Sequence, residues 1–140
     1  MYDVMSPACP TRQVITHVGQ KWSALVLYAL ESGEPLRFSE LRRVMADVSQ
    51  KSLTQTLRQL ERDGFVERTA HPTVPVTVEY RLTPLGRELS GVVAAIREFA
   101  YATMPRIEAA RVRYDARGGP GDGQPAAGRG TTIPAGAPGR

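Results

Sequence analysis

The sequence predicts a winged helix–turn–helix domain, which is a mainly α-helical fold with a two-stranded β-wing, here with additional N- and C-terminal dimerisation helices. Three observations predict this fold. A tight turn at 46–48 joins two short helical segments, and the second of these segments is strongly amphipathic. After Gly64 the period of the apolar residues changes from near four to two, which is typical of strands.

The first two helices are predicted by the residues at their ends. Pro10 suits the first position of a helix that runs to Gly19, and Cys9 then stands at its cap. A second, more apolar helix is expected over 21–33. Within it, Trp22 could stack on a ligand, but its apolar neighbours on the same face favour a place in the core.

Serines are expected to cap the two helices of the helix–turn–helix. Ser39 precedes a segment in which Leu41 and either Val44 or Met45 recur at helical spacing. Ser49 precedes the second helix, which stops at an Asp-Gly pair.

Alternating segments predict the strands. Residues 65–69 and 76–82 place apolar and polar side chains in turn, as a half-buried hairpin requires. The connection 71–75 contains two prolines and is read as a loop. Residues 36–38 are expected to add a short, separate strand.

The last helical segment carries a regular apolar seam. Thr83 and Pro84 provide a cap and a first helical residue, and Pro105 is expected to break the helix and start another. The seam is too regular for a helix that only covers a small core, so we expect a two-fold dimer built from this segment and the first helix. The predicted interface residues are Val14, Ile15, Leu85, Leu89, Val92, Ile96 and Phe99.

The helix over 49–62 separates its side chains by type. Leu57 and Leu60 lie within roughly 40° of Leu53 on a helical wheel, and amides, hydroxyls and cations occupy the other sides. Such a face could simply be solvated, but the preceding helix and the following hairpin favour DNA recognition. Glutamine and arginine can read base edges, and short hydroxyls allow close approach to the backbone. The predicted DNA contacts are Gln50, Lys51, Ser52, Thr54, Gln55, Arg58 and Arg62.

Further DNA contacts are expected outside this helix. Arg42 and Arg43, on the first helix of the motif, could bind the phosphate backbone, although a solvated face explains them equally well. His71 and Thr73 are candidates for contacts from the wing, and His71 is expected to be an exposed loop residue rather than a switch.

Several blocks of the sequence resemble a known family. CP at residues 9–10, GQKWSALVLYAL, LRFSELRR, SQKSLTQTLRQLERDGFVER and PVTVEYRLTPLGREL stand in the order and spacing of the HxlR-type transcriptional regulators, a bacterial branch of the MarR-like winged helix proteins. The resemblance covers roughly 9–100. It implies a homodimer whose terminal helices form the interface, with helix 49–62 in the major groove of double-stranded DNA and hairpin 66–82 as the wing.

Cys9 is a candidate redox residue. It directly precedes Pro10, so its sulfur is expected at a helix N-terminus, where unpaired N–H groups and the helix dipole favour the thiolate. Some HxlR-type regulators use a cysteine at the matching place to sense electrophiles or oxidants, so the resemblance implies an oxidant or another small-molecule effector. A buried capping residue without reactivity is the alternative.

Composition limits the remaining possibilities. The 140 residues suffice for one domain, and the net charge of +4 only weakly favours an anionic partner. We expect residues 1–116 to form the folded domain and residues 117–140, of which twelve are Gly or Pro, to form a disordered tail. The N-terminus lacks the pattern of a signal peptide, and the longest apolar run, 24–30, is too short for a bilayer, so a cytoplasmic protein at the nucleoid is expected.

Catalysis has no sequence support. The two histidines are far apart, no Cys, His or Asp cluster has metal-ligand spacing, and no glycine-rich phosphate loop follows a strand. We therefore expect no enzyme activity, cofactor or metal. A winged helix that binds only proteins is a rival class, but it predicts an apolar or acidic face on 49–62, and this face is basic and rich in amides.

Overall fold

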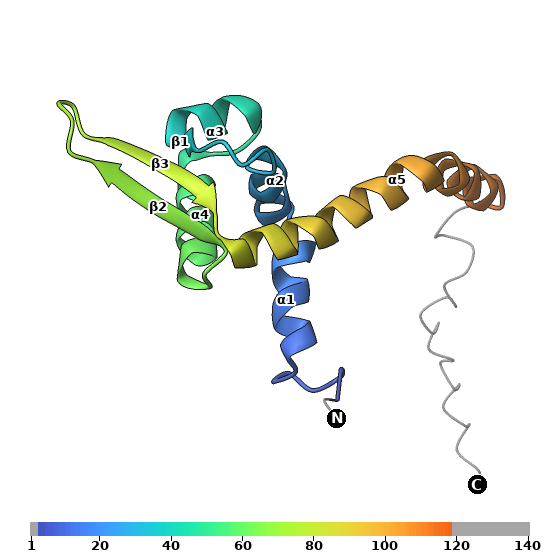
Figure 1. Ribbon diagram of the computed structural model, residues 1–140. Helices are drawn as coiled ribbons and strands as arrows, with labels where there is room; N and C mark the ends of the chain where they lie inside the picture. Colours follow the sequence, from blue (N-terminus) through green and yellow to red (C-terminus); the bar gives the residue numbers. More distant parts are fainter. Residues whose placement is uncertain (1–2, 119–140) are drawn as a thin grey trace, which may run out of the picture. The chain divides into compact units, whose positions relative to one another are not determined.

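The computed structural model describes residues 3–118, so most of the predicted tail lies outside the described part. The chain divides into two compact units, Met1–Phe99 and Ala100–Arg140. Eight elements follow one another in the described residues, in the predicted order (Figure 1): α1 Pro10–Gly19, α2 Lys21–Ala29, β1 Leu36–Arg37, α3 Phe38–Val44, α4 Gln50–Arg62, β2 Val66–His71, β3 Thr77–Leu82 and α5 Pro84–Ala116.

The first two helices have the predicted starts. Pro10 opens α1 with Cys9 as its N-cap residue, in extended conformation. Helix α2 ends at Ala29, earlier than predicted, because the chain turns there through residues 30–33. Gly33 closes this turn with a φ of 87°, a left-handed conformation that glycine adopts without strain.

The start of α3 differs from the prediction. Arg37 is the N-cap residue, so Ser39 lies inside the first turn and does not cap the helix. The Glu40 carboxylate accepts a hydrogen bond from the Arg37 N–H at 3.1 Å, which satisfies one backbone donor at this end of the helix. Met45 is buried with Leu41, whereas Val44 is exposed.

Helix α4 has the predicted cap. The Ser49 hydroxyl accepts a hydrogen bond from the Ser52 N–H at 3.0 Å. The helix ends at Asp63, its C-cap residue, and Gly64 then turns the chain with a φ of 82°. This capping fixes both ends of the helix that carries the predicted DNA-binding face.

The sheet has three strands, because the short strand that was expected to be separate joins the predicted two-stranded hairpin. Its order is β1-β3-β2, and both pairs are antiparallel. The two-residue β1 pairs with β3 through Leu36 opposite Tyr80, because β3 would otherwise leave one edge of its backbone unpaired. The β2–β3 hairpin forms the predicted wing and extends away from the helices (Figure 1).

Helix α5 begins as predicted but does not break. The Thr83 hydroxyl accepts a hydrogen bond from the Gly86 N–H at 3.0 Å, and Pro84 is the first helical residue. Contrary to the prediction, the helix continues through Pro105 to Ala116. A proline inside a helix removes its own backbone hydrogen bond and strains one turn, and the neighbouring hydrogen bonds maintain the helix here.

The core of the first unit lies where the helices meet the base of the sheet. Its fully buried side chains come mainly from α2, α3 and α4: Val26, Leu27, Leu30, Leu41, Leu53, Leu57 and Leu60. Val66 and Leu82 add the base of the hairpin, and Val93 adds α5. Trp22 is half-buried against this core, which confirms the core interpretation of that residue. No helix found within residues 3–118 combines the length and apolar character needed to span a membrane.

Candidate nucleic-acid interface

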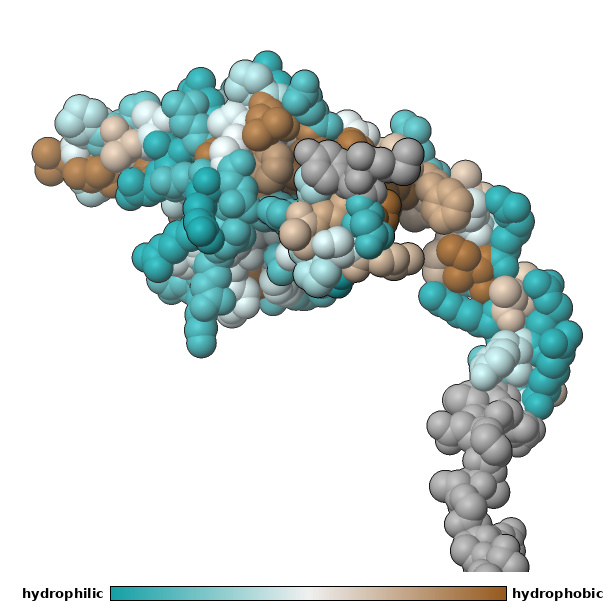
Figure 2. Space-filling model, turned by 90° about the horizontal axis from the view of Figure 1, so that it is seen from below, coloured by the Kyte–Doolittle hydropathy of each residue, from teal (hydrophilic) through white to brown (hydrophobic). Residues whose placement is uncertain are grey.

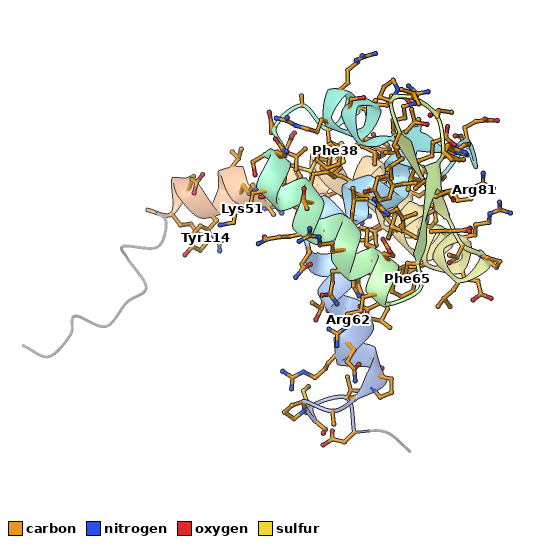
Figure 3. The ribbon with its side chains drawn as sticks, turned by 90° about the vertical axis from the view of Figure 1, so that its left-hand side faces the viewer. Phe38, Lys51, Arg62, Phe65, Arg81 and Tyr114 are labelled. Atoms are coloured by element: carbon orange, nitrogen blue, oxygen red, sulfur yellow. The ribbon has the colours of Figure 1, made fainter. Side chains whose placement is uncertain are left out.

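Helix α4 turns its leucines inward and its polar side chains outward. Leu53, Leu57 and Leu60 belong to the core. In Figure 3 Lys51 and Arg62 mark the two ends of the helix. Five of the predicted DNA contacts are exposed and Ser52 and Thr54 are half-buried; the exposed residues are Gln50, Lys51, Gln55, Arg58 and Arg62. Because the leucines pack inward, the polar face of α4 remains exposed to solvent.

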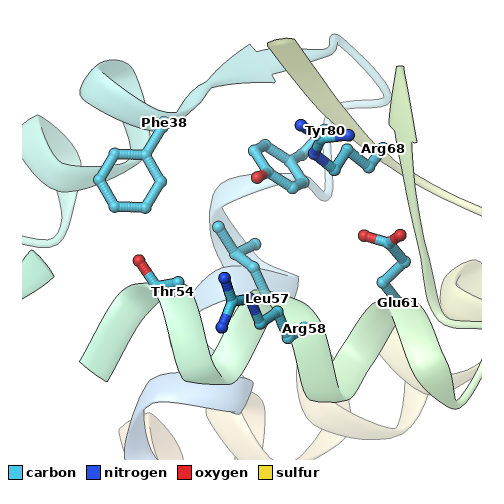
Figure 4. Close-up of a pocket in the computed structure, with 7 residues that line it drawn as sticks. All are labelled: Phe38, Thr54, Leu57, Arg58, Glu61, Arg68 and Tyr80. Carbon is cyan, nitrogen blue, oxygen red and sulfur yellow. The ribbon is translucent and has the colours of Figure 1, made fainter. Parts of the chain in front are cut away.

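A hollow of about 380 Å³ separates α4 from the sheet. Figure 4 shows Thr54 and Arg58 of α4 pointing into the same space as Arg68 of β2 and Tyr80 of β3. The structure thus brings a predicted helix contact next to a cation of the wing. Glu61 also lines this hollow and lowers its net positive charge.

Phe38 completes the lining of this hollow, and the sequence did not point to it as a site residue. It is the first residue of α3, and it is half-buried against the core as many ordinary apolar residues are. No local signal distinguishes the two roles, because the hollow forms only when α3, α4 and β3 meet.

A second hollow, of about 280 Å³, lies between the start of α2 and α4. Ser52 and Gln55 of α4 line it together with Gln20 and Trp22. Beside it, the Lys21 ammonium group lies 4.5 Å from the centre of the Trp22 ring, a cation–π contact. The N–H groups at the start of α2 and the Lys21 charge flank the exposed face of α4, where a phosphate group would be favoured.

His71 is half-buried at the end of β2, so the prediction of an exposed loop residue is wrong, whereas Thr73 lies in the loop that follows. The His71 imidazole Nε2 lies 3.1 Å from a Glu79 carboxylate oxygen. The Thr73 hydroxyl donates to the Pro75 carbonyl at 2.7 Å. Both side chains therefore help to fix the loop, and hydrophobic side chains extend from its tip (Figure 2), where Val74 and Val76 are exposed. On α3, Arg42 and Arg43 are both exposed.

The predicted interface residues are exposed with one exception. Leu89 is only 5% exposed and packs in the core of its own unit, so the prediction of Leu89 as an interface residue is wrong. The helix faces the core through Leu89 and Val93, which are four residues apart, and the seam read from the sequence mixes this buried face with a solvent-facing one. The exposed members are Val14, Ile15, Leu85, Val92, Ile96 and Phe99.

An apolar hollow joins the two helices that carry these exposed residues. It has a volume of about 450 Å³ and is lined by α1 residues, including Val14, Ile15 and Val18, and by Val92 of α5. Exposed apolar surface of this kind is typical of protein interfaces.

Cys9 is buried, with 2% of its surface exposed. A hydrogen bond from the Thr11 side chain is the main reason that the pKa of the Cys9 thiol lies below its ordinary value. The backbone N–H groups of Thr11 and Arg12 act in the same direction, and burial opposes them. The Arg12 guanidinium group binds the Met5 carbonyl at 2.8 Å, so it is directed to the backbone and not to the sulfur.

His17 is a buried polar residue for which the sequence predicted no functional role. It bonds Asp63, which lies 46 residues further along the chain, so no local pattern could reveal the pair. Within residues 3–118, no group of three or more His, Cys, Asp or Glu side chains could hold a metal ion.

Comparisons with known proteins agree with this architecture. The family model described as HxlR-like helix-turn-helix matches residues 17–108. The chain is 45% identical over 109 residues to the uncharacterized HTH-type transcriptional regulator YtfH of Escherichia coli K12, which covers 78% of this chain and 86% of YtfH.

Two solved structures extend the comparison. The ytfH transcriptional regulator from Salmonella typhimurium has a TM-score of 0.71 and 44% identity, and the match covers 79% of this chain and 98% of that one. The redox regulator HypR in its oxidized form has a TM-score of 0.63 and 37% identity, covering 67% of this chain and 96% of HypR. The chain therefore belongs to the HxlR-like helix-turn-helix family of transcriptional regulators, within the MarR-like winged helix proteins.

Proposed function

We propose that the protein binds double-stranded DNA in a sequence-specific manner, as a homodimer on a pseudo-palindromic operator in the cytoplasm. Helix α4 enters the major groove and the β2–β3 hairpin acts as the wing. One observation carries this proposal: three core leucines hold α4 in place, while its opposite face exposes amides and cations.

The exposed side chains divide by the contacts that they can make. Gln55 and Arg58 lie in the middle of α4 and suit base edges, since glutamine can bond adenine and arginine can bond guanine through two hydrogen bonds. Lys51 and Arg62, near the ends of the helix, suit phosphate groups. Lys21, at the start of α2, would add another phosphate contact.

The exposed apolar residues of α1 and α5 support the dimer. Val14, Ile15 and Val92 line one apolar hollow, and Ile96 continues the exposed side of α5. A second copy of the chain would bury this surface. Two recognition helices related by a two-fold axis would then require half-sites about 10 bp apart, or a multiple of that spacing.

The test uses DNA that the protein itself selects from a random-sequence duplex pool. Gln55→Ala and Arg58→Ala should each reduce discrimination between the selected site and a scrambled duplex, because a good base contact contributes about 1–3 kcal/mol. Gln13→Ala, an exposed glutamine on α1, serves as the matched control and should behave like the parent. If both α4 variants discriminate like the parent, the wrong face has been assigned to the groove.

A redox-controlled regulator is the second candidate. Cys9 caps the start of α1, its thiol has a lowered pKa, and the chain resembles a redox regulator whose oxidized form has been solved. Because Cys9 is the single cysteine of the chain, oxidation would have to join it to Cys9 of a second copy or to a small thiol. In the first case two thiols lose two protons and two electrons to the oxidant.

Diamide treatment tests this second candidate. A disulfide-linked dimer on a non-reducing gel, together with altered affinity for the selected DNA, is expected for the parent and not for Cys9→Ser. If the parent forms no disulfide or adduct and keeps its DNA affinity, Cys9 is a structural cap and oxidants do not act through it.

A further inference from the structure

His17 connects α1 to the end of α4. It lies in the last turn of α1, is 5% exposed, and its Nε2 atom is 2.6 Å from a carboxylate oxygen of Asp63. Asp63 is the C-cap residue of α4. The contact therefore joins the helix proposed to meet the partner subunit to the helix proposed to read DNA. Burying a polar group costs free energy unless it is hydrogen-bonded, so this burial makes the pairing specific.

The contact with Asp63 determines which nitrogen of the imidazole carries the hydrogen. A carboxylate oxygen only accepts hydrogen bonds, so Nε2 of His17 must carry the hydrogen. The other ring nitrogen, Nδ1, is buried and has no hydrogen-bond partner within the described residues. The Phe65 ring packs against the imidazole edge to face, with 5.1 Å between ring centres and an angle of 76°. Among residues 3–118, Asp63 is therefore the single polar partner of the ring.

Neighbouring groups favour the charged form of the Asp63 carboxyl, which is the hydrogen-bond acceptor for His17. Gln59 donates to the same carboxylate oxygen at 2.9 Å, from the last turn of α4. This hydrogen bond is the main reason that the pKa of the Asp63 carboxyl lies below its ordinary value. His17 and the charge of Arg62 act in the same direction, and burial opposes them. Hydrogen bonds to a charged group are shorter and stronger than those between neutral groups.

We propose that His17 is a positioning residue for DNA recognition, which sets the orientation of the C-terminal turn of α4 relative to α1 through Asp63. The proposal rests on the proposed function, because only a dimer on DNA makes that orientation matter. Both α1 and α4 pack on α2, but apolar packing is non-directional, whereas a charged hydrogen bond fixes direction. Val14 and Ile15 stand on α1 within one turn of His17, so a partner subunit packed there would act on α4 through this pair.

The variants separate positioning from simple loss of stability. His17→Leu puts an apolar side chain of similar size in place of the imidazole and removes the donor. His17→Gln retains a side-chain N–H at about the place of Nε2, so it should keep the hydrogen bond to Asp63 and most of the parent's DNA discrimination. Asp63→Ala removes the acceptor. The Asp63 side chain is 34% exposed, so this variant should fold even if His17→Leu does not. Glu31→Ala is the matched control, because it breaks an ion pair between the turn after α2 and Arg97 of α5 and leaves α4 untouched.

The first measurement is the ratio of affinities for the selected and the scrambled duplex, with folding and dimerisation checked by circular dichroism and light scattering. His17→Leu and Asp63→Ala should each lower the ratio about tenfold, which is within the range for losing a hydrogen bond to a charged group. The double variant should lose no more than Asp63→Ala alone, since that variant already removes the hydrogen bond to His17 together with the one from Gln59. His17→Gln should recover most of the ratio and Glu31→Ala should match the parent.

The second measurement needs no DNA. Amide hydrogen exchange should accelerate in the last turn of α4, residues 59–63, in His17→Leu and Asp63→Ala, return toward the parent rate in His17→Gln, and stay unchanged at Leu53. If the folded variants keep both the parent ratio and the parent exchange rates, His17 does not position α4. A parent that fails to discriminate between duplexes would instead contradict the proposed function, and the exchange rates alone would then decide whether the pair holds α4.

Discussion

At the residue scale, Gly86 shows how closely α5 approaches the chain before β2. A Cβ atom at this position would lie 1.9 Å from the Phe65 carbonyl oxygen, so no larger residue fits without a shift of the backbone. The cap at Thr83 brings the two segments together, since its hydroxyl also donates to the Gly64 carbonyl. The wing and α5 are thus joined at one crowded point.

Gly86→Ala should therefore destabilise the protein by about 1–3 kcal/mol, the usual cost of overpacking. The measurement is the free energy of unfolding in urea. Gly91→Ala, on the same helix, has no atom within 4 Å of the added Cβ and should be neutral or stabilising by up to about 1 kcal/mol, since alanine favours helices. Equal effects of the two substitutions would contradict the close approach.

At the element scale, two polar contacts hold α2 against α5. The Tyr28 hydroxyl donates to the Val93 carbonyl at 2.8 Å. The Arg97 guanidinium group donates two hydrogen bonds to the Glu31 carboxylate, at 2.8 and 3.1 Å, and lies 5.2 Å from the centre of the Tyr28 ring. These contacts fix the first part of α5 on α2 and on the turn that follows it.

Acidification should weaken the contact between Glu31 and Arg97. The hydrogen bonds from Arg97 hold the pKa of Glu31 below its ordinary value, so the folded state binds the carboxyl proton less readily than the unfolded chain. The stabilisation is then present above the ordinary pKa of glutamate, about 4.3, and is lost as pH falls through the lower value in the folded state. Urea unfolding across this range should show a smaller pH dependence for Glu31→Gln than for the parent; an equal dependence would mean that solvent screens the pair completely.

At the scale of the whole molecule, the proposed assembly makes two predictions. DNA affinity should fall steeply with salt, because each phosphate that the protein neutralises releases counterions. The logarithm of the binding constant should fall by about 0.9 per phosphate for each tenfold rise in salt. Fluorescence anisotropy over a salt series measures the slope, and Lys51→Ala should reduce it by about two phosphates, one for each subunit of the proposed dimer. A flat response would contradict binding to the DNA backbone.

The second prediction separates the interface from the core on one helix. Ile96→Glu places a charge on the exposed side of α5 and should yield monomers that lose affinity for the selected DNA. Leu89→Ala opens a cavity in the core and should lower the stability of the subunit by about 2–5 kcal/mol. Light scattering at micromolar concentration together with urea unfolding distinguishes the two. A monomeric parent protein under these conditions would overturn the dimer.

The sequence by itself determined the features that depend on neighbours along the chain. The leucine period and the Ser49 cap define α4, and the change to alternating residues predicts the hairpin, because these signals act within one or two turns. The exposed polar face of α4 follows from the same period. Most of the candidate DNA-binding face was therefore predictable.

Only the tertiary structure decided which surfaces meet. The pairing of β1 with β3 joins Leu36 to Tyr80, and the bond between His17 and Asp63 spans 46 residues, so neither leaves a local pattern. The position of Leu89 depended on packing as well, since a period shows that a helix has an apolar face but not what covers it. The physical reason is that hydrophobic burial is non-directional: spacing along the chain selects the face, and only the assembled elements select its partner.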